Sequence, residues 1–481
     1  MTKLRLAGQG FLAGLLLTAS LPPFGWWPLG LAGAALLAAS LAERRARERL
    51  LCGAAAGLAL YGVGWWWMSE FSAPGYVIAV LVESAILAVA MLVVRPGRLW
   101  AFPAALVLAE AVRDRWPFGG VPLAGLPLGQ VGGPLAPAAR VGGQLLLVAL
   151  VGVVGVVAVA VARRRRLTAG LGLAAVTAVV TAGVLVPGAH DAGRLRVAAV
   201  QGGGQRGVRA IYRDPQGVFL AQLRASDAVT TPVDLVVWPE DVIDVDRVQG
   251  SGEAEAVAAM ARRLDATVVA GIVEDAGPDH FRNAAVAWSP GGRIVSRYDK
   301  VHPVPFGEVI PARGLVEHFA DLTAVPRDMA RGHGPGVLRT PVGRLGVAVS
   351  YEVFFADRGR SAVRHGATIL LVPTNASSFS SGQVPAQELG AARLRALETG
   401  RTVVQAGPTG YSAVVDWRGR VLAHSSLGRR AVIQREVRRR AGQTLATRLG
   451  ETPLVGLAVV GAAALAVGRR REAGPSPARP T

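Results

Sequence analysis

The chain contains very little cysteine and very little lysine. Its 481 residues include one cysteine, Cys52, so no internal disulfide and no cysteine-ligated metal cluster can form. Of the 52 basic residues only Lys3 and Lys300 are lysines, and all the others are arginines. A thiol nucleophile is therefore excluded everywhere except at residue 52. We expect no metal and no organic cofactor.

Apolar residues make up 51% of the chain and are concentrated in long runs before residue 188. A membrane-spanning helix needs about 20 mainly apolar residues. The sequence predicts a multi-pass α-helical membrane bundle of about eight spans. The expected spans are 7–21, 28–42, 51–68, 75–94, 99–113, 141–162, 167–187 and 453–468.

The formal net charge of +19 does not indicate a nucleic-acid partner, because the basic residues cluster at the ends of the apolar runs. Short cytoplasmic loops are enriched in Lys and Arg. With eight spans, one side of the membrane collects 16 basic residues in its short loops and tails. The opposite side has Arg115 and Arg140 in its short loops. The 16 are Lys3, Arg5, Arg44, Arg45, Arg47, Arg49, Arg95, Arg98, Arg163, Arg164, Arg165, Arg166, Arg469, Arg470, Arg471 and Arg479.

This asymmetry predicts that both termini are cytoplasmic and that the long segment between the seventh and eighth spans lies outside. The expected domains are a membrane domain at 1–187, an extracytoplasmic domain at 188–450, a C-terminal span at 451–468 and a cytoplasmic tail at 469–481. Glu110 and Arg113 fall at membrane depth, where we expect them to form a structural ion pair, with contact to substrate as the alternative. Trp65, Trp66, Trp67 and Trp116 are expected in an aromatic belt at the headgroup level.

The long extracytoplasmic segment alternates short strands and helices. Val-rich stretches bounded by Gly, Pro or Asp predict strands, and helical periodicity is expected at 216–228, 252–264, 355–365 and 385–399. The expected strands are 195–200, 234–240, 267–273, 283–289, 293–299, 344–350, 367–373, 401–407 and 411–417. The pattern predicts a layered α/β domain.

Three polar residues close predicted strands: Glu240 in WPE, Lys300 in YDK and Ser350 in SYE. A parallel-type α/β sheet would bring such strand ends together at one edge. Lys300 is notable because this chain uses arginine for nearly every other cation. A compact ammonium can approach a developing oxyanion more closely than a planar guanidinium. A chance surface lysine is the alternative.

The ordered motifs WPE, YDKVHPVPFGE and SYE resemble the Glu-Lys-Cys triad of the nitrilase superfamily. Together with several N-terminal spans and one C-terminal span, they resemble the apolipoprotein N-acyltransferase family over nearly the whole chain. The resemblance implies an extracytoplasmic α-β-β-α sandwich in the bacterial plasma membrane. It implies transfer of an acyl chain from a phospholipid to the α-amino group of a diacylglyceryl-cysteine lipoprotein.

By position, Glu240 would be the general base, Lys300 would stabilise the oxyanion, and Glu308 and Glu352 would support the site. Gln201, Asn375 and Phe379 are candidates for the region that contacts substrate or forms a lid. These seven residues stand at matching positions of the chain.

The nucleophile position departs from the family pattern, because Ser350 stands where the family has cysteine. A hydroxyl depends on its base far more than a thiol does. Four hypotheses stay open: an acyltransferase that forms an oxygen ester on Ser350, a catalytically silent member that binds lipid or lipoprotein, a membrane-anchored amidase of the same fold, and a transporter.

Overall fold

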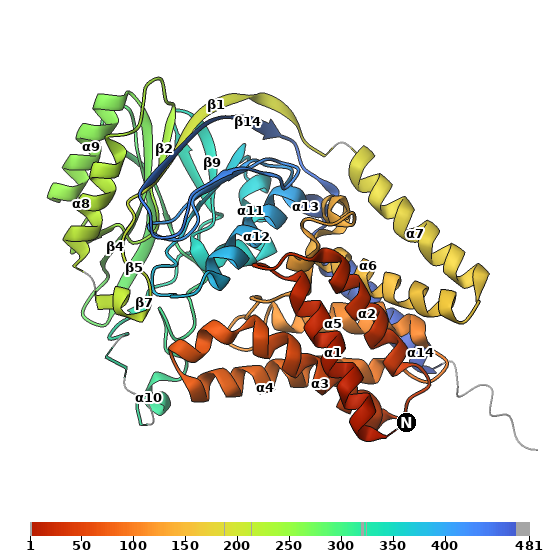
Figure 1. The fold of residues 1–481 in the computed structure, drawn as a ribbon. Helices are drawn as coiled ribbons and strands as arrows, with labels where there is room; N and C mark the ends of the chain where they lie inside the picture. The colour runs from red at the N-terminus through yellow and green to blue at the C-terminus, as the bar shows by residue number, and fades with distance from the viewer. Residues whose placement is uncertain (1, 187, 213, 319–321, 324, 468–481) are drawn as a thin grey trace, which may run out of the picture.

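The computed structural model describes the chain except residues 1, 187, 213, 319–321, 324 and 468–481. Apolar helices from the first 185 residues lie together with a helix near the C-terminus, and an α/β domain lies against them (Figure 1). The seven N-terminal helices are α1 Lys3–Ser20, α2 Trp27–Leu41, α3 Ala46–Gly64, α4 Ala73–Ala90, α5 Phe102–Arg113, α6 Ala139–Ala162 and α7 Arg166–Leu185. The C-terminal helix is α14 Thr452–Val467.

A helix is present at each of the eight expected spans, but they differ in length and hydropathy. Among the described residues, three segments are long and apolar enough to cross a membrane by length and composition, namely Ala73–Val93, Ala136–Ala162 and Arg166–Leu185. Trp27–Leu41 and Thr452–Leu465 are shorter apolar helices. The length and hydropathy of these helices therefore do not confirm the predicted number of eight spans.

Helices α1 and α3 pack very closely. A Cβ atom on Gly10 would lie 2.4 Å from the Cys52 carbonyl oxygen, and one on Gly14 would lie 2.2 Å from that of Ala56. Small residues one turn apart let two helix backbones approach in this way. The two glycines therefore set the distance between the helices.

The expected pair of Glu110 and Arg113 is confirmed, with an Nη1 to Oε2 distance of 3.0 Å. Arg113 also pairs with Glu83 of α4, a partner that the sequence did not indicate. The placement of Trp65 in the aromatic belt is wrong. Its side chain is 1% exposed, and its indole N–H donates to the Leu123 carbonyl at 3.1 Å. Trp66 and Trp116 are exposed, as the belt requires.

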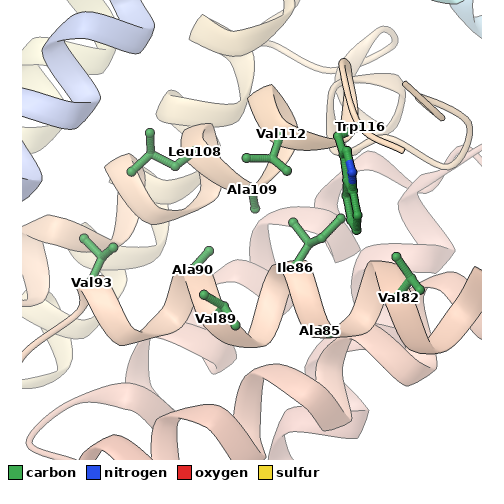
Figure 2. Close-up of a pocket in the computed structure, with 10 residues that line it drawn as sticks. All are labelled: Val82, Ala85, Ile86, Val89, Ala90, Val93, Leu108, Ala109, Val112 and Trp116. Atoms are coloured by element: carbon green, nitrogen blue, oxygen red, sulfur yellow. The ribbon is translucent and has the colours of Figure 1, made fainter. Parts of the chain in front are cut away.

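A groove with a volume of about 520 Å³ lies between α4 and α5. Its lining consists of apolar side chains, among them Ile86, Val89 and Leu108 (Figure 2). Val93 and Trp116 lie towards opposite ends of the groove in this view. An exposed apolar surface of this kind is typical of helices that face lipid chains.

The α/β domain contains two mixed sheets. The first has the order β14-β1-β2-β4-β5-β6, with β3 also paired to β4 and β7 to β5, and the second has the order β13-β12-β11-β10-β9-β8. The strands of the first sheet are β1 His190–Gln201, β2 Leu235–Val237, β3 Ile243–Val245, β4 Thr267–Asp275, β5 His280–Trp288, β6 Ile294–Asp299, β7 Asp328–Met329 and β14 Ala431–Ala441. Those of the second are β8 Val337–Thr340, β9 Gly343–Val347, β10 Ile369–Pro373, β11 Val403–Ala406, β12 Ala413–Val415 and β13 Val421–His424.

Four layers result from the packing of these sheets. Side chains such as Val237 and Val269 of the first sheet share one buried core with Val347 and Leu371 of the second. Helices α8 Pro215–Ser226 and α9 Gly252–Leu264 cover the outer face of the first sheet, and α11 Ala356–Arg364 and α12 Gln383–Thr399 lie on that of the second (Figure 1). The remaining short α-helices of the described residues are α10 Arg313–Val316 and α13 Leu445–Leu449. The α-β-β-α sandwich and its expected strands and helices are confirmed.

The second helical layer faces the apolar helices. Leu394 and Leu397 of α12 belong to the same buried cluster as Leu60 of α3 and Leu147 of α6. In the chain, α11 follows β9 and α12 follows β10, so this layer connects the ends of these strands to the apolar helices. Any site at the ends of these strands is therefore close to the apolar helices.

Candidate active site

Glu240, Lys300 and Ser350 follow strand ends, although not along one edge of a parallel sheet. Glu240 follows β2 and Lys300 follows β6, both in the first sheet, whereas Ser350 follows β9 in the second. Strand β6 runs antiparallel to its neighbour β5. The expectation of a single parallel edge is wrong, because these strand ends belong to two different sheets.

Glu240 reaches its position through close packing of its backbone. Trp238 donates its amide to the Val269 carbonyl at 2.8 Å, which extends the pairing of β2 with β4. A Cβ atom on Gly271 would lie 2.5 Å from the Glu240 Cα atom, so β4 needs a glycine there. The Glu240 side chain is 3% exposed, and it therefore needs partners inside the protein.

Lys300 supplies those partners together with Asn283. The Lys300 ammonium lies 2.8 Å from Glu240 Oε1 and 2.9 Å from Glu308 Oε1, and it is 1% exposed. The Asn283 amide donates to the same two oxygens, at 2.9 Å and 2.8 Å. One cation and one amide thus hold two carboxylates side by side. Sequence reasoning missed Asn283, because an Asn inside a predicted strand carries no signal of its own.

The charges in this cluster keep Lys300 protonated. Burial alone would lower the pKa of Lys300, but Glu240 and Glu308 outweigh it and hold that pKa above its usual value. Burial raises the pKa of Glu240, and Lys300 opposes that effect. The cluster therefore carries a fixed positive charge at Lys300 Nζ, bounded by two acidic groups.

Ser350 lies at a sharp turn between β9 and the 3₁₀ helix η7 Ser350–Phe354. Its φ angle is +49°, a left-handed conformation that non-glycine residues rarely adopt and that occurs often at functional sites. Its side chain is 7% exposed. Its hydroxyl donates to Glu388 Oε1 at 3.4 Å and accepts from Thr374 Oγ1 at 3.3 Å. Glu388 and Thr374 are further residues that the motif comparison did not include.

Glu352 ties the Lys300 segment to the Ser350 turn. Its carboxylate accepts the Tyr298 hydroxyl at 2.8 Å and the backbone amides of Val301, His302 and Val349 at 2.7 Å, 3.1 Å and 2.8 Å. These donors flank Lys300 on one side and Ser350 on the other. Glu352 is fully buried, so its role in the geometry is to hold the two segments in register across the sheets.

Gln201 and Asn375 make contacts within the protein. The Gln201 amide donates to the Ser426 and Arg429 carbonyls, and its oxygen accepts from Ser412 and Ser425. The Asn375 side chain donates to Asp241 at 3.4 Å.

Phe379 lies where the α/β domain meets the helices. Its ring packs edge-on against Trp67 and Phe71, at centroid distances of 5.1 Å and 5.4 Å. The following residue, Ser380, donates through both its amide and its hydroxyl to Glu70. The loop that follows β10 is thus fixed to the segment after α3.

The same interface reaches the candidate nucleophile. The Tyr351 hydroxyl donates to the Gly120 carbonyl at 2.8 Å, and Gln387 of α12 donates to the Gly64 carbonyl at 3.0 Å. Ser350 and Glu388 are the direct neighbours of these two anchors. The site is therefore held by contacts with the apolar helices as well as by the sandwich.

Comparisons with known proteins match both parts of the chain. A family described as carbon-nitrogen hydrolase matches residues 196–446, and the apolipoprotein N-acyltransferase N-terminal domain matches residues 13–183. The chain is 31% identical to the apolipoprotein N-acyltransferase of Mycolicibacterium smegmatis, covering 94% of this chain and 83% of that protein. It is also 31% identical to that of Azotobacter vinelandii, covering 97% and 96%.

Two further matches are partial. The match to the apolipoprotein N-acyltransferase of Geobacter metallireducens is 29% identical and spans 56% of this chain and 53% of that protein. Among solved structures, Saccharomyces cerevisiae Nit3, a member of the nitrilase superfamily, is 20% identical with a TM-score of 0.40, covering 51% of this chain and 90% of that one.

Proposed function

Because the chain belongs to the apolipoprotein N-acyltransferase family, we propose that it acylates lipoproteins in the bacterial plasma membrane. The acyl chain comes from a phospholipid and goes to the α-amino group of an N-terminal diacylglyceryl-cysteine. The observation that carries the proposal is the Glu240–Lys300–Glu308 cluster, whose charges act on the carboxyl group of Glu388, the acid that Ser350 contacts. The chain also matches the Azotobacter vinelandii relative over 97% of its own length.

The proposed reaction has two steps and one covalent intermediate. Ser350 Oγ attacks the ester carbonyl of the phospholipid and forms an acyl ester, and a lysophospholipid leaves. The lipoprotein amine then attacks this ester and regenerates Ser350. Lys300 stabilises the negative charge of each tetrahedral intermediate. Glu240, at the position of the family's general base, accepts a hydrogen bond from the Lys300 ammonium. The amide of Tyr351, at the start of η7, is available as an oxyanion donor because the first amides of a helix lack intrahelical partners.

The contacts between the site and the apolar helices favour acyl transfer over hydrolysis. The loop after β10 packs on Trp67 and Phe71, and Tyr351 is bound to Gly120. Such contacts place the nucleophile next to a surface that lipids can reach and limit the access of water to an acyl ester. A membrane-anchored amidase would gain nothing from this placement.

We extend the proposal to the topology. All eight apolar helices are taken as spans, with 1–187 as the membrane domain, 188–450 as the extracytoplasmic domain and 451–468 as the last span. The proposed cytoplasmic tail, 469–481, lies outside the residues that the structure describes. Both termini are cytoplasmic in this arrangement. The asymmetry of basic residues between the loops supports it, as does the presence of a helix at each expected span.

The test is acyl transfer by the full-length protein. Purified protein is incubated with phospholipid vesicles and a diacylglyceryl-cysteine lipopeptide, and the lipopeptide is examined by mass spectrometry for one added acyl chain. Wild type is expected to add it and Ser350→Ala to add none above the small residual rate of a site that only binds and polarises. Ser350→Cys is expected to be active and to trap the acyl group as a hydroxylamine-sensitive thioester.

The second candidate is a silent member that binds lipid or lipoprotein, and the serine at position 350 favours it. If this candidate is correct, neither wild type nor Ser350→Ala adds an acyl chain to the lipopeptide. An active Ser350→Cys variant beside an inert wild type would then mean that the scaffold is complete and the nucleophile alone is missing. A Ser350→Ala variant as active as wild type would remove Ser350 from the reaction.

A further inference from the structure

The hydroxyl of Ser350 contacts a carboxylate other than the one in the family triad. Its partners are Glu388 Oε1 at 3.4 Å and Thr374 Oγ1 at 3.3 Å. Thr374 also lies 2.6 Å from Glu388 Oε1. A hydroxyl has one hydrogen to donate, and the much shorter contact directs that of Thr374 to Glu388. The Ser350 proton is then free to point at the same carboxylate oxygen.

Glu240 is engaged elsewhere. Its Oε1 atom accepts hydrogen bonds from the Lys300 ammonium and from the Asn283 amide. Within the part of the chain that the structure describes, no hydrogen bond joins Glu240 to Ser350. Oε1 of Glu240 therefore holds the cation in place, and the hydrogen bond that Ser350 donates goes to a different carboxylate, that of Glu388.

Glu388 has the surroundings of a proton acceptor. Its side chain is 3% exposed, and its Oε2 atom is buried without a hydrogen-bond partner among the described residues. Burial raises the pKa of this carboxyl group to about 7, and the negative charge of Glu240 acts in the same direction. The hydrogen bonds from Thr374 and Ser350 and the positive charge of Lys300 act against it. A group that titrates near neutral pH can both accept and return a proton during a reaction.

The position of Glu388 is fixed by the contact between the domain and the helices. Its neighbour Gln387 donates to the Gly64 carbonyl at 3.0 Å and accepts the Ala124 amide at 2.9 Å. These two bonds hold the first half of α12 against the ends of the apolar helices. The carboxylate is thus presented to Ser350 from the membrane-facing side of the site.

We propose that Glu388 is the general base that activates Ser350, an assignment that rests on the proposed acyl transfer and adds the residue that handles its protons. In the first step the Ser350 O–H bond breaks and the proton moves to Glu388 Oε1. Oγ bonds to the ester carbonyl carbon, the bond from that carbon to the glyceryl oxygen breaks, and Glu388 gives its proton to this oxygen. Glu388 ends the step as a carboxylate.

In the second step Glu388 again accepts and returns a proton, and the nucleophile is the lipopeptide amine. The lipopeptide nitrogen bonds to the acyl carbon and passes one proton to Glu388. The bond from the acyl carbon to Ser350 Oγ breaks, and Glu388 returns the proton to that oxygen. Glu240, which keeps its bonds to Lys300 and Asn283, is a positioning residue for the ammonium in both steps.

The test compares Glu388→Gln with wild type in the full-length protein, with two readouts. One is acyl transfer to the lipopeptide, and the other is labelling of Ser350 by a fluorophosphonate probe, which needs an activated serine and no lipoprotein. We expect Glu388→Gln to lower both rates at least about 100-fold. The wild-type rates should rise with pH through about 7, and the variant should lose this rise.

Two further variants separate a chemical role from a structural one. In a Ser350→Cys background, Glu388→Gln should cost less than about tenfold, because a thiol needs its base much less than a hydroxyl does. Glu398→Gln is the matched control, since Glu398 is a buried carboxylate on the same helix that pairs with Arg360 and Arg395. It should keep the wild-type pH profile even where it lowers the melting temperature.

The outcomes distinguish this inference from the proposed function. Labelling that depends on Glu388 in a protein that acylates no lipopeptide would support the base and contradict the acyltransferase proposal. Equal losses from Glu388→Gln in the serine and cysteine backgrounds would overturn the base assignment. Unlabelled wild type, or an unchanged pH profile in Glu388→Gln, would overturn it as well.

Discussion

Replacing Lys300 by methionine tests the buried charge cluster most directly. The side chain keeps much of its length but loses an ammonium that lies 2.8 Å from Glu240 and 2.9 Å from Glu308, at 1% exposure. Both carboxylates would stay buried with the Asn283 amide as their shared donor. Removing one partner of a buried ion pair typically lowers the free energy of unfolding by about 3–5 kcal/mol. Without an oxyanion stabiliser, acyl transfer should also fall by about 10²–10³-fold.

The pH dependence of this loss follows from the charges. In wild type, folding raises the pKa of Lys300. Its contribution to the free energy of unfolding is therefore fully present below the pKa of the unfolded state, about 10.4. That contribution is lost only as the pH rises through the pKa of the folded state. In Lys300→Met, Glu240 loses the cation that opposes the effect of burial, so the pKa of its carboxyl group in the folded protein rises further above its usual value. The folded state then binds more protons than the unfolded one, so the variant becomes more stable as pH falls.

The assay is thermal unfolding of the full-length protein in detergent, at pH values from 5 to 8, with Arg262→Met as control. Arg262 pairs with Glu255 on the exposed face of α9, where a salt bridge contributes about 0–1 kcal/mol. We expect a large drop in melting temperature for Lys300→Met at pH 8, a smaller drop at pH 5, and almost none for the control. A Lys300→Met protein that melts like wild type at pH 8 would refute the reasoning about this cluster.

Two further predictions concern the segment that holds the site and the orientation of the chain. Glu352→Gln replaces one acceptor oxygen by an amide donor that faces N–H and O–H donors. We expect the free energy of unfolding to fall by about 1–3 kcal/mol and kcat to fall markedly. An unchanged melting curve would contradict the role of Glu352 in holding the two segments together. For the topology, an impermeant thiol reagent applied to intact cells should label Gln249→Cys but neither Ala46→Cys nor Arg165→Cys. The background labelling should be low because Cys52 is buried. Labelling in the reverse pattern would overturn the proposed orientation.

Much of the fold could be predicted from the sequence because its signals are local. The Val-rich strands, the periodic helices and the eight apolar stretches depend on nearby residues, and each one has its counterpart in the structure. Trp65 was misplaced because an indole at the end of an apolar helix looks the same in sequence whether it faces lipid or the Leu123 carbonyl. Strand β14, which pairs with β1 over most of its length, was missed because its arginines obscure the alternation.

The candidate site could be predicted only in part. Motifs at strand ends located Glu240, Lys300 and Ser350, but the sheet to which each strand belongs depends on pairing between distant segments. Glu388 lies 38 residues from Ser350, and only the packing of α12 brings the two together. One signal was available in the sequence. Glu398 has an arginine three residues away on either side, Arg395 and Arg401, whereas Glu388 has no basic residue three or four positions away.

The unpartnered oxygen of Glu388 bears on whether this chain is a working variant or a silent one. A buried carboxylate oxygen without a donor costs about 1–3 kcal/mol, and Glu388 Oε2 lacks such a partner among the described residues. Glutamine at position 388 would remove the charge and keep the shape, so the fold alone gives no reason for the acid. The left-handed φ of Ser350 is a second local cost, of order 1–3 kcal/mol, at the very residue that the acid contacts. Backbone strain of this kind clusters at functional sites, so it favours a serine that reacts over one that only fills the place of a lost cysteine.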